Sequence, residues 1–133
     1  ILHIVDSVAH ALKDVGVKTG TIGVMGTQAT VELGLYQYRL NKLGWDCITP
    51  TQEQMDTIVQ PSIDMIKANN YENVSDNILS VAQTLINRGA RAIVLGCTEL
   101  PLAVRQEVLG VTPIINSIDS LVKMSIKRCV NGL

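Results

Sequence analysis

The stretch A-I-V-L-G-C-T-E-L-P-L, residues 92–102, runs from four apolar residues through a glycine to a cysteine. A short continuous apolar run is typical of a strand buried on both faces of a parallel sheet. Gly96 predicts the end of that strand, and Thr98 and Pro101 are residue types expected at the start of a following helix. Cys97 is therefore predicted at the carboxyl end of a parallel strand, where open α/β sheets bind ligands. The positive end of the helix would favour a thiolate, which predicts a reactive cysteine.

Outward from this stretch, strand-like and helix-like segments alternate along the whole chain. Further strand-like runs lie at 1–5, 21–25, 47–49 and 113–116. Helical patterns lie at 6–15, 29–43, 52–59, 62–68, 74–86, 100–108 and 117–129. In the pattern at 29–43 the apolar set is Val31, Leu35, Tyr38 and Leu43, and Pro61 either starts a second helical piece or kinks the first.

This alternation predicts an α/β fold, a doubly wound, flavodoxin-like parallel sheet of about four strands flanked by helices. We expect one domain over residues 1–133. Residues 1–18 form a connecting strand and helix in this interpretation, and residues 113–133 form the final strand and helix.

Composition excludes several classes of function. Of the 133 residues 47% are apolar, and the formal net charge is −1. This charge argues against electrostatic binding to nucleic acid or to an anionic membrane, and no apolar run is long enough to span a bilayer. The three cysteines, Cys47, Cys97 and Cys129, are widely spaced without a C-x-x-C pair. We therefore expect no disulfide framework or metal site, and a cytoplasmic location.

A second strand-to-helix turn lies at G-V-M-G-T-Q-A-T, residues 23–30. Thr27 and Thr30 place hydroxyl and amide groups at a helix start, a setting that binds carboxylate or phosphate. The alternative is a turn in which Thr27 only caps the helix. If the two strands are neighbours, Thr27, Thr30, Cys97 and Thr98 converge at one sheet edge. The alternative for Cys97 itself is an inert buried thiol.

Two charged residues are weaker candidates. Glu99 follows Thr98 directly and either supports the helix start or tunes the thiol. Lys67 ends an apolar stretch, and the alternative to a binding role is a solvated charge at a helix end. Cys47 is interpreted as strand core and Cys129 as a residue on a helix face.

The motifs G-T-x-x-T-V at 26–31, Lys67, and G-C-T-E-L at 96–100 together resemble the aspartate/glutamate racemase superfamily, and within it the aspartate racemase branch. The resemblance implies an enzyme that inverts the α-carbon of aspartate or a similar acidic amino acid without pyridoxal phosphate, metal or other cofactor. Two cysteines face each other across the substrate in such enzymes, and Cys97 would be the second-domain cysteine. Thr27, Thr30 and Thr98 would hold the substrate carboxylate and amino groups, and Lys67 its side-chain carboxylate.

The resemblance covers only the second half of the family pattern. It implies a missing N-terminal domain with the partner cysteine, a chain that does not racemise alone, and homo-oligomerisation to cover exposed apolar surface. Two alternatives stay open. One is a related decarboxylase, cis–trans isomerase or hydantoin racemase, and the other is a non-catalytic ligand-binding α/β domain.

Overall fold

A five-stranded sheet in the order β2-β1-β3-β5-β4 forms the middle layer of the protein. The structure is a computed structural model and describes residues 3–131, with side chains described for residues 3–126. The strands are β1 (Gly20–Met25), β2 (Trp45–Ile48), β3 (Ala90–Leu95), β4 (Val108–Leu109) and β5 (Thr112–Asn116). β2, β1, β3 and β5 pair in parallel, and β4 pairs with β5 in the antiparallel sense.

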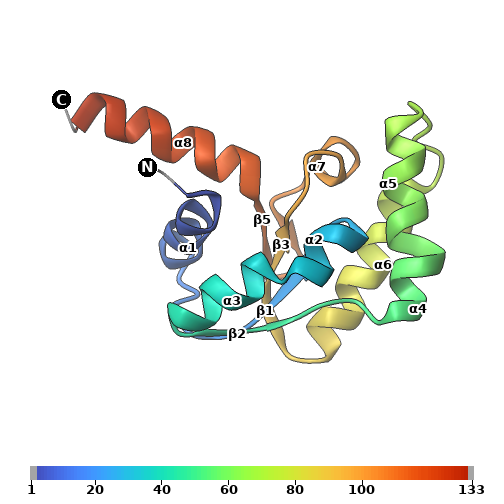
Figure 1. Ribbon diagram of the computed structural model, residues 1–133, viewed down its shortest axis with the longest axis horizontal. Helices are drawn as coiled ribbons and strands as arrows, with labels where there is room; N and C mark the ends of the chain where they lie inside the picture. The colour runs from blue at the N-terminus through green and yellow to red at the C-terminus, as the bar shows by residue number, and fades with distance from the viewer. Residues whose placement is uncertain (1–2, 132–133) are drawn as a thin grey trace.

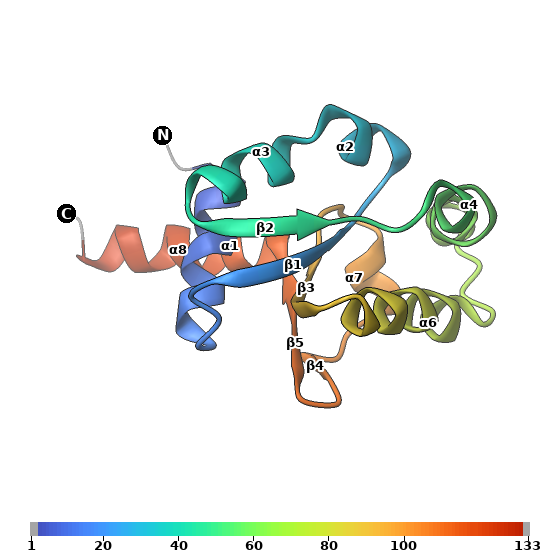
Figure 2. The ribbon, with the colours of Figure 1, turned by 90° about the horizontal axis from the view of Figure 1, so that it is seen from below.

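Helices cover both faces of this sheet, as Figures 1 and 2 show. They are α1 (Ile4–Asp14), α2 (Gln28–Leu33), α3 (Leu35–Lys42), α4 (Gln52–Gln54), α5 (Gln60–Lys67), α6 (Val74–Asn87), α7 (Leu100–Ala103) and α8 (Ser117–Asn131), with a π-helical turn η1 (Met55–Val59) between α4 and α5. The expected doubly wound α/β class is confirmed. Among the described residues, no helix has the length and apolarity needed to cross a membrane.

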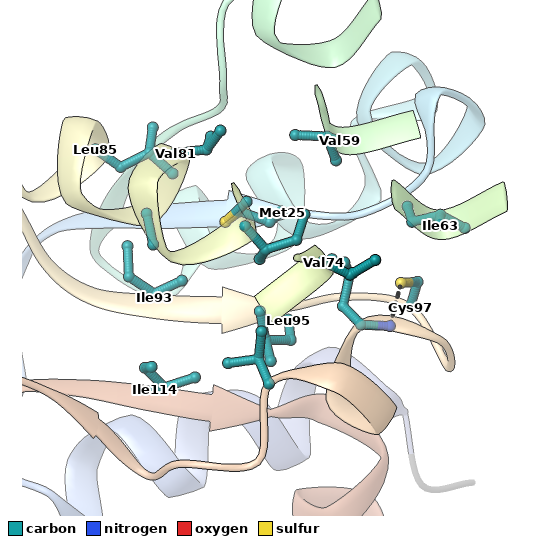
Figure 3. Close-up of a cluster of buried hydrophobic side chains, with 14 of the residues drawn as sticks. Met25, Val59, Ile63, Val74, Val81, Leu85, Ile93, Leu95, Cys97 and Ile114 are labelled. Atoms are coloured by element: carbon teal, nitrogen blue, oxygen red, sulfur yellow. Dashed lines mark hydrogen bonds between the residues drawn. The ribbon is translucent and has the colours of Figure 1, made fainter. Parts of the chain in front are cut away.

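The strands alternate their side chains between two apolar cores. In β3, Ala92 and Val94 point to a core shared with α1 and α3, whereas Ile93 and Leu95 point to a core shared with α5 and α6. This period of two is a consequence of the pleated backbone, in which successive side chains leave opposite faces. The run of apolar residues in β3 is thus explained by burial on both sides. Figure 3 shows the second core, with Ile93 and Leu95 beneath α6.

The expected strand at 1–5 is wrong for the described part of that segment. α1 begins at Ile4, with the His3 imidazole accepting a hydrogen bond from the Val5 N–H at 3.1 Å. Residues 1–2 lie outside the described residues. Val5 and Val8 are buried on one face of this helix, so the apolar residues follow a helical rather than a strand period here.

The single helix expected at 29–43 is two helices. Gly34 adopts a left-handed conformation (φ +67°) that ends α2 and begins α3, a conformation that suits a residue without a side chain. This break changes which face of α3 is buried. Tyr36 and Leu40 lie in the core, whereas Leu35, Tyr38 and Leu43 of the expected apolar set are exposed.

The helix expected at 100–108 is also shorter than its pattern. α7 ends at Ala103, and Val108 and Leu109 form β4, a short strand that turns back onto β5 through Gly110. The sheet therefore has five strands rather than about four. The segments expected at 52–59 and 62–68 follow one another directly through η1, with Pro61 in the first turn of α5, where proline is tolerated.

Candidate active site

The two glycine turns of the sequence lie side by side at the carboxyl edge of the sheet. β1 and β3 are neighbours with Met25 opposite Leu95, and the Gly96 N–H donates a 2.7 Å hydrogen bond to the Met25 carbonyl. The chain continues from β1 to β2 on one side and from β3 to β5 on the other. The turns thus occupy the topological switch point, which is where open α/β sheets bind ligands.

The first turn is held by its own threonines. Thr27 caps α2 by accepting the Thr30 N–H at 3.1 Å, and the two hydroxyl oxygens lie 2.9 Å apart. The Gln28 N–H donates to the Gln60 Oε1 at 2.9 Å. These amide donors are already bonded within the protein. The polar groups that the turn offers to a ligand are therefore mainly the two half-buried hydroxyls.

Cys97 lies where its sequence position predicted, immediately beyond the end of β3. Its side chain is buried, at 9% exposure, at the end of the core that contains Ile63 and Val74 (Figure 3). The Sγ atom accepts the Leu100 N–H at 3.4 Å, the contact drawn as a dashed line.

The expectation of a lowered thiol pKa is not met in this chain by itself. Burial, the largest cause, raises the pKa of Cys97 above its ordinary value. The backbone N–H groups of Leu100 and Glu99 lower it, the Glu99 carboxylate raises it, and the Lys67 ammonium lowers it. The physical reason is that α7 is a single turn of four residues, so its dipole is too short to offset desolvation.

The polar residues around Cys97 form a short chain of contacts. The Thr98 hydroxyl donates to the Glu99 Oε2 at 2.6 Å, and the Lys67 Nζ lies 3.9 Å from the Glu99 Oε1. Thr98 is exposed and does not cap α7, which begins after Glu99 without a side-chain cap. The structure thus joins Lys67, at the end of α5, to the turn that follows β3, and Glu99 is the link between them.

A groove of about 570 Å³ adjoins this turn on the β5 side, between α1, β5, α8 and the segment 101–107. His10, Arg105 and Lys123 are among its lining residues, and none of the six predicted site residues lines it. The switch point, rather than this groove, is therefore the candidate active site.

Comparison with known proteins identifies the family of this chain. The model of the Asp/Glu/hydantoin racemase family matches residues 1–125. The chain belongs to this family. An uncharacterised protein of Pectobacterium carotovorum is 32% identical over 108 residues, which are 81% of this chain and 70% of that protein. A glutamate racemase of Persephonella marina is 28% identical over 77% of this chain and 38% of its own length.

Among solved structures, an aspartate racemase of Picrophilus torridus is 29% identical, with a TM-score of 0.75. The match covers 95% of this chain and 51% of that one. This racemase-family chain thus spans about half the length of that solved relative and less of the glutamate racemase.

Three residues near the site of this racemase-family domain were missed from the sequence. Gln60 bonds the first turn, and Tyr36 packs against Gly96 of the second. Ser117 is buried directly after β5, whose Asn116 pairs with Leu95. A signal existed for Ser117, which follows the β5 strand as Cys97 follows β3, because adjacent parallel strands end at the same edge. No comparable signal existed for Tyr36, because its burial depends on the break at Gly34.

Proposed function

We propose that this chain carries one catalytic half of a cofactor-independent racemase for aspartate or a similar acidic amino acid, with Cys97 as one of its two proton-transfer residues. One observation carries the proposal. The Cys97 turn and the Thr27–Thr30 turn are joined at the switch point of a racemase-family sheet by the 2.7 Å bond from Gly96 to Met25. A thiol and two hydroxyls there suit a substrate that has a carboxylate beside an acidic carbon.

The proposed chemistry at Cys97 is a proton transfer without redox change. As thiolate, its sulfur takes the α-proton of the substrate and becomes a thiol, and the electron pair left on carbon delocalises into the substrate carboxylate. In the reverse direction the thiol returns its proton to the carbanion. The hydroxyls of Thr27, Thr30 and Thr98 would hold the carboxylate and amino groups while the negative charge develops.

Lys67 is proposed to recognise the substrate side chain, with Glu99 as the residue that positions its ammonium. The Lys67 ammonium is half-exposed, and the Glu99 Oε1 at 3.9 Å is its carboxylate partner. A substrate carboxylate has the same charge and shape as that of Glu99, so it would be bound by the same ammonium. This assignment favours acidic amino acids over neutral ones.

Inversion needs a second acid on the opposite face of the α-carbon, because one sulfur reaches only one face. Cys47 does not supply it, since it packs with the core of α1 and α3, on the other face of the sheet from Cys97. The side chain of Cys129 lies outside the described side chains. We infer that the second group belongs to a further domain of the protein or to a second copy. Exposed Val122 and Ile126 on α8 support a covering partner.

One observation favours a second candidate, ligand binding without chemistry. Burial holds the pKa of Cys97 above its ordinary value, which disfavours a base at neutral pH. If Cys97 is the base of a racemase, the further domain or second copy that supplies the second acid must therefore lower the pKa of the Cys97 sulfur. Alkylation of Cys97 by iodoacetamide against pH separates the two: enhanced labelling near neutral pH in the intact protein supports the base, and ordinary labelling supports binding only.

The decisive experiment measures α-proton exchange with the intact protein in deuterated water. We expect L-aspartate or L-glutamate to lose its α-proton signal in NMR spectra and the D-enantiomer to form. Cys97→Ala should lower racemisation roughly 10²- to 10⁴-fold, the range for removing a general acid–base residue. Cys47→Ala is the matched control and should racemise at the parent rate. A Cys97→Ala variant that racemises as fast as the parent would contradict the proposal.

A further inference from the structure

One helix, α5, contacts both turns of the candidate site. It begins at Gln60, whose Oε1 accepts the Gln28 N–H at 2.9 Å, directly after the Thr27 cap of the first turn. It ends at Lys67, whose Nζ lies 3.9 Å from the Glu99 Oε1 beside the second turn. At the usual rise of a helix, Gln60 and Lys67 lie about 10 Å apart along the axis. The helix therefore spans the distance between the turn with the hydroxyls and the turn with the thiol.

The side-chain amide of Gln60 is held at both of its polar atoms. Its Oε1 accepts the Gln28 N–H, and its Nε2 donates to the Asp64 Oδ1 at 3.1 Å, one turn further along α5. The Gln28 N–H belongs to the first turn of α2, where a helix leaves its own backbone donors without a partner. Gln60 therefore satisfies a donor of the first turn and does so in one fixed orientation.

Apolar packing holds α5 against the core but does not by itself fix its position along the sheet edge. Ile63 and Ile66 are buried in the core that contains Cys97, and Figure 3 shows Ile63 at the same end of this core as Cys97. Burial of apolar surface is non-directional, whereas a hydrogen bond has a preferred distance and angle. The bond from Gln28 to Gln60 therefore fixes where α5, and with it Lys67, lies relative to the first turn.

We propose that Gln60 is a positioning residue that sets the distance between the Lys67 ammonium and the Thr27–Thr30 turn, and thereby the length of the acidic side chain that the site accepts. This inference rests on the proposed function, in which the turn holds the α-carboxylate and Lys67 holds the side-chain carboxylate. Aspartate and glutamate differ by one methylene group between these carboxylates, so a fixed distance favours one of them. Gln60 acts through α5 and does not touch the substrate in this role.

The test is the binding of succinate and glutarate to the intact protein, measured by isothermal titration calorimetry. These diacids have the two carboxylates of aspartate and glutamate but no stereocentre, so binding is measured without turnover. We expect the parent to bind one diacid more tightly than the other. Gln60→Met keeps a side chain of similar length but loses the acceptor. It should reduce the ratio of the two Kd values roughly threefold to tenfold, the contribution of one hydrogen bond.

Two further variants serve as controls. Gln60→Glu keeps an oxygen that accepts the Gln28 N–H, so it should keep the parent ratio, although its negative charge weakens the binding of both diacids. Gln54→Met removes a comparable long-range bond, because the Gln54 Nε2 donates to the Thr84 hydroxyl at 3.0 Å. Thr84 lies on α6, which carries none of the predicted site residues. Gln54→Met should therefore lose stability and keep the parent ratio.

A merely structural role for Gln60 would lower the melting temperature of Gln60→Met without moving the ratio of Kd values, and that result overturns the proposal. An equal shift of the ratio in Gln54→Met also overturns it, because any lost hydrogen bond in the segment would then change selectivity. A parent that binds neither diacid, or binds both equally, contradicts it as well.

The outcome is distinguishable from failure of the proposed function, because diacid binding needs no proton transfer. If Cys97→Ala racemises at the parent rate while Gln60→Met changes the ratio, the assignment of Cys97 fails and the role of Gln60 stands. If Cys97→Ala is inactive while Gln60→Met keeps the parent ratio, the racemase assignment stands and the role of Gln60 does not.

Discussion

Met25 and Gly96 are joined by a 2.7 Å hydrogen bond from the Gly96 N–H to the Met25 carbonyl. This bond extends the β1–β3 ladder by one step beyond Leu95, so the Thr27 and Cys97 turns start from the same point. A Cβ on Gly26 would lie 3.7 Å from the Gly96 carbonyl carbon, in ordinary contact. This contact, together with the β1–β3 pairing, places the beginnings of the two turns side by side at the candidate site.

Replacing Gly96 with alanine should destabilise the protein. The new methyl group would lie 3.0 Å from the Tyr36 ring and 3.3 Å from the Met25 carbonyl oxygen. Overpacking of this kind costs about 1–3 kcal/mol, measurable by urea unfolding. Gly26→Ala is the matched comparison, because its methyl group meets Thr30 at 3.3 Å, a side chain that can rotate. Equal losses in the two variants would count against the tight contact at Gly96.

Variants of the two threonines in the first turn should distinguish a loss of protein stability from a loss of substrate binding. Thr27→Val removes the hydroxyl that accepts the Thr30 N–H and should cost about 1 kcal/mol of stability, the usual value of an N-cap. Thr30→Val leaves that cap in place. If Thr30 holds substrate, this variant raises KM with little change in unfolding free energy.

Thr51→Val provides the control for these two variants. Thr51 caps α4 in the same way, accepting the Gln54 N–H at 3.1 Å, but it is exposed and outside the candidate site. It should lose stability while KM stays at the parent value. A raised KM in Thr51→Val would show that cap loss alone disturbs the site.

Lys67→Met should weaken binding of acidic substrates. Loss of a charge-assisted contact with the side-chain carboxylate corresponds to roughly a tenfold rise in KM. Lys42→Met is the control, because the Lys42 ammonium lies over the Tyr38 ring at 4.6 Å, on α3. If both variants keep the parent KM for aspartate and glutamate, Lys67 is a surface charge and the substrate assignment loses its support.

Alkaline pH should destabilise the fold through ionisation of the half-buried thiol of Cys47. Burial, with a smaller contribution from the Asp46 carboxylate, raises the pKa of Cys47 from 9.0 to about 11. The folded state holds this proton more tightly than the unfolded chain, so the contribution to stability is complete below pH 9 and is lost as the pH rises through about 11. Cys47→Ala should therefore lose less of its urea stability over that interval than the parent does. Equal losses of urea stability in Cys47→Ala and in the parent would mean that the fold does not keep the Cys47 thiol neutral.

The parts of the fold predicted correctly are those in which local pattern and burial agree. α6 was expected at 74–86 and is observed at Val74–Asn87, because a clear apolar face packs on the sheet over its whole length. The prediction failed where a backbone conformation or a strand pairing overrode the helical pattern of apolar residues. Gly34 divided the helix expected at 29–43, and pairing with β5 drew Val108 and Leu109 out of the helix expected at 100–108.

For the site, the sequence by itself determined the two strand-turn units, because an apolar run followed by glycine and a small polar residue specifies a buried strand and a turn locally. Cys97, Thr27 and Thr30 could be predicted as candidate site residues on that basis. The tertiary structure alone decided that Lys67 meets Glu99, that Tyr36 lies under Gly96, and that burial raises the thiol pKa of Cys97. These depend on strand order and on packing between distant segments, whose free energy is determined by three-dimensional contacts rather than by neighbours along the chain.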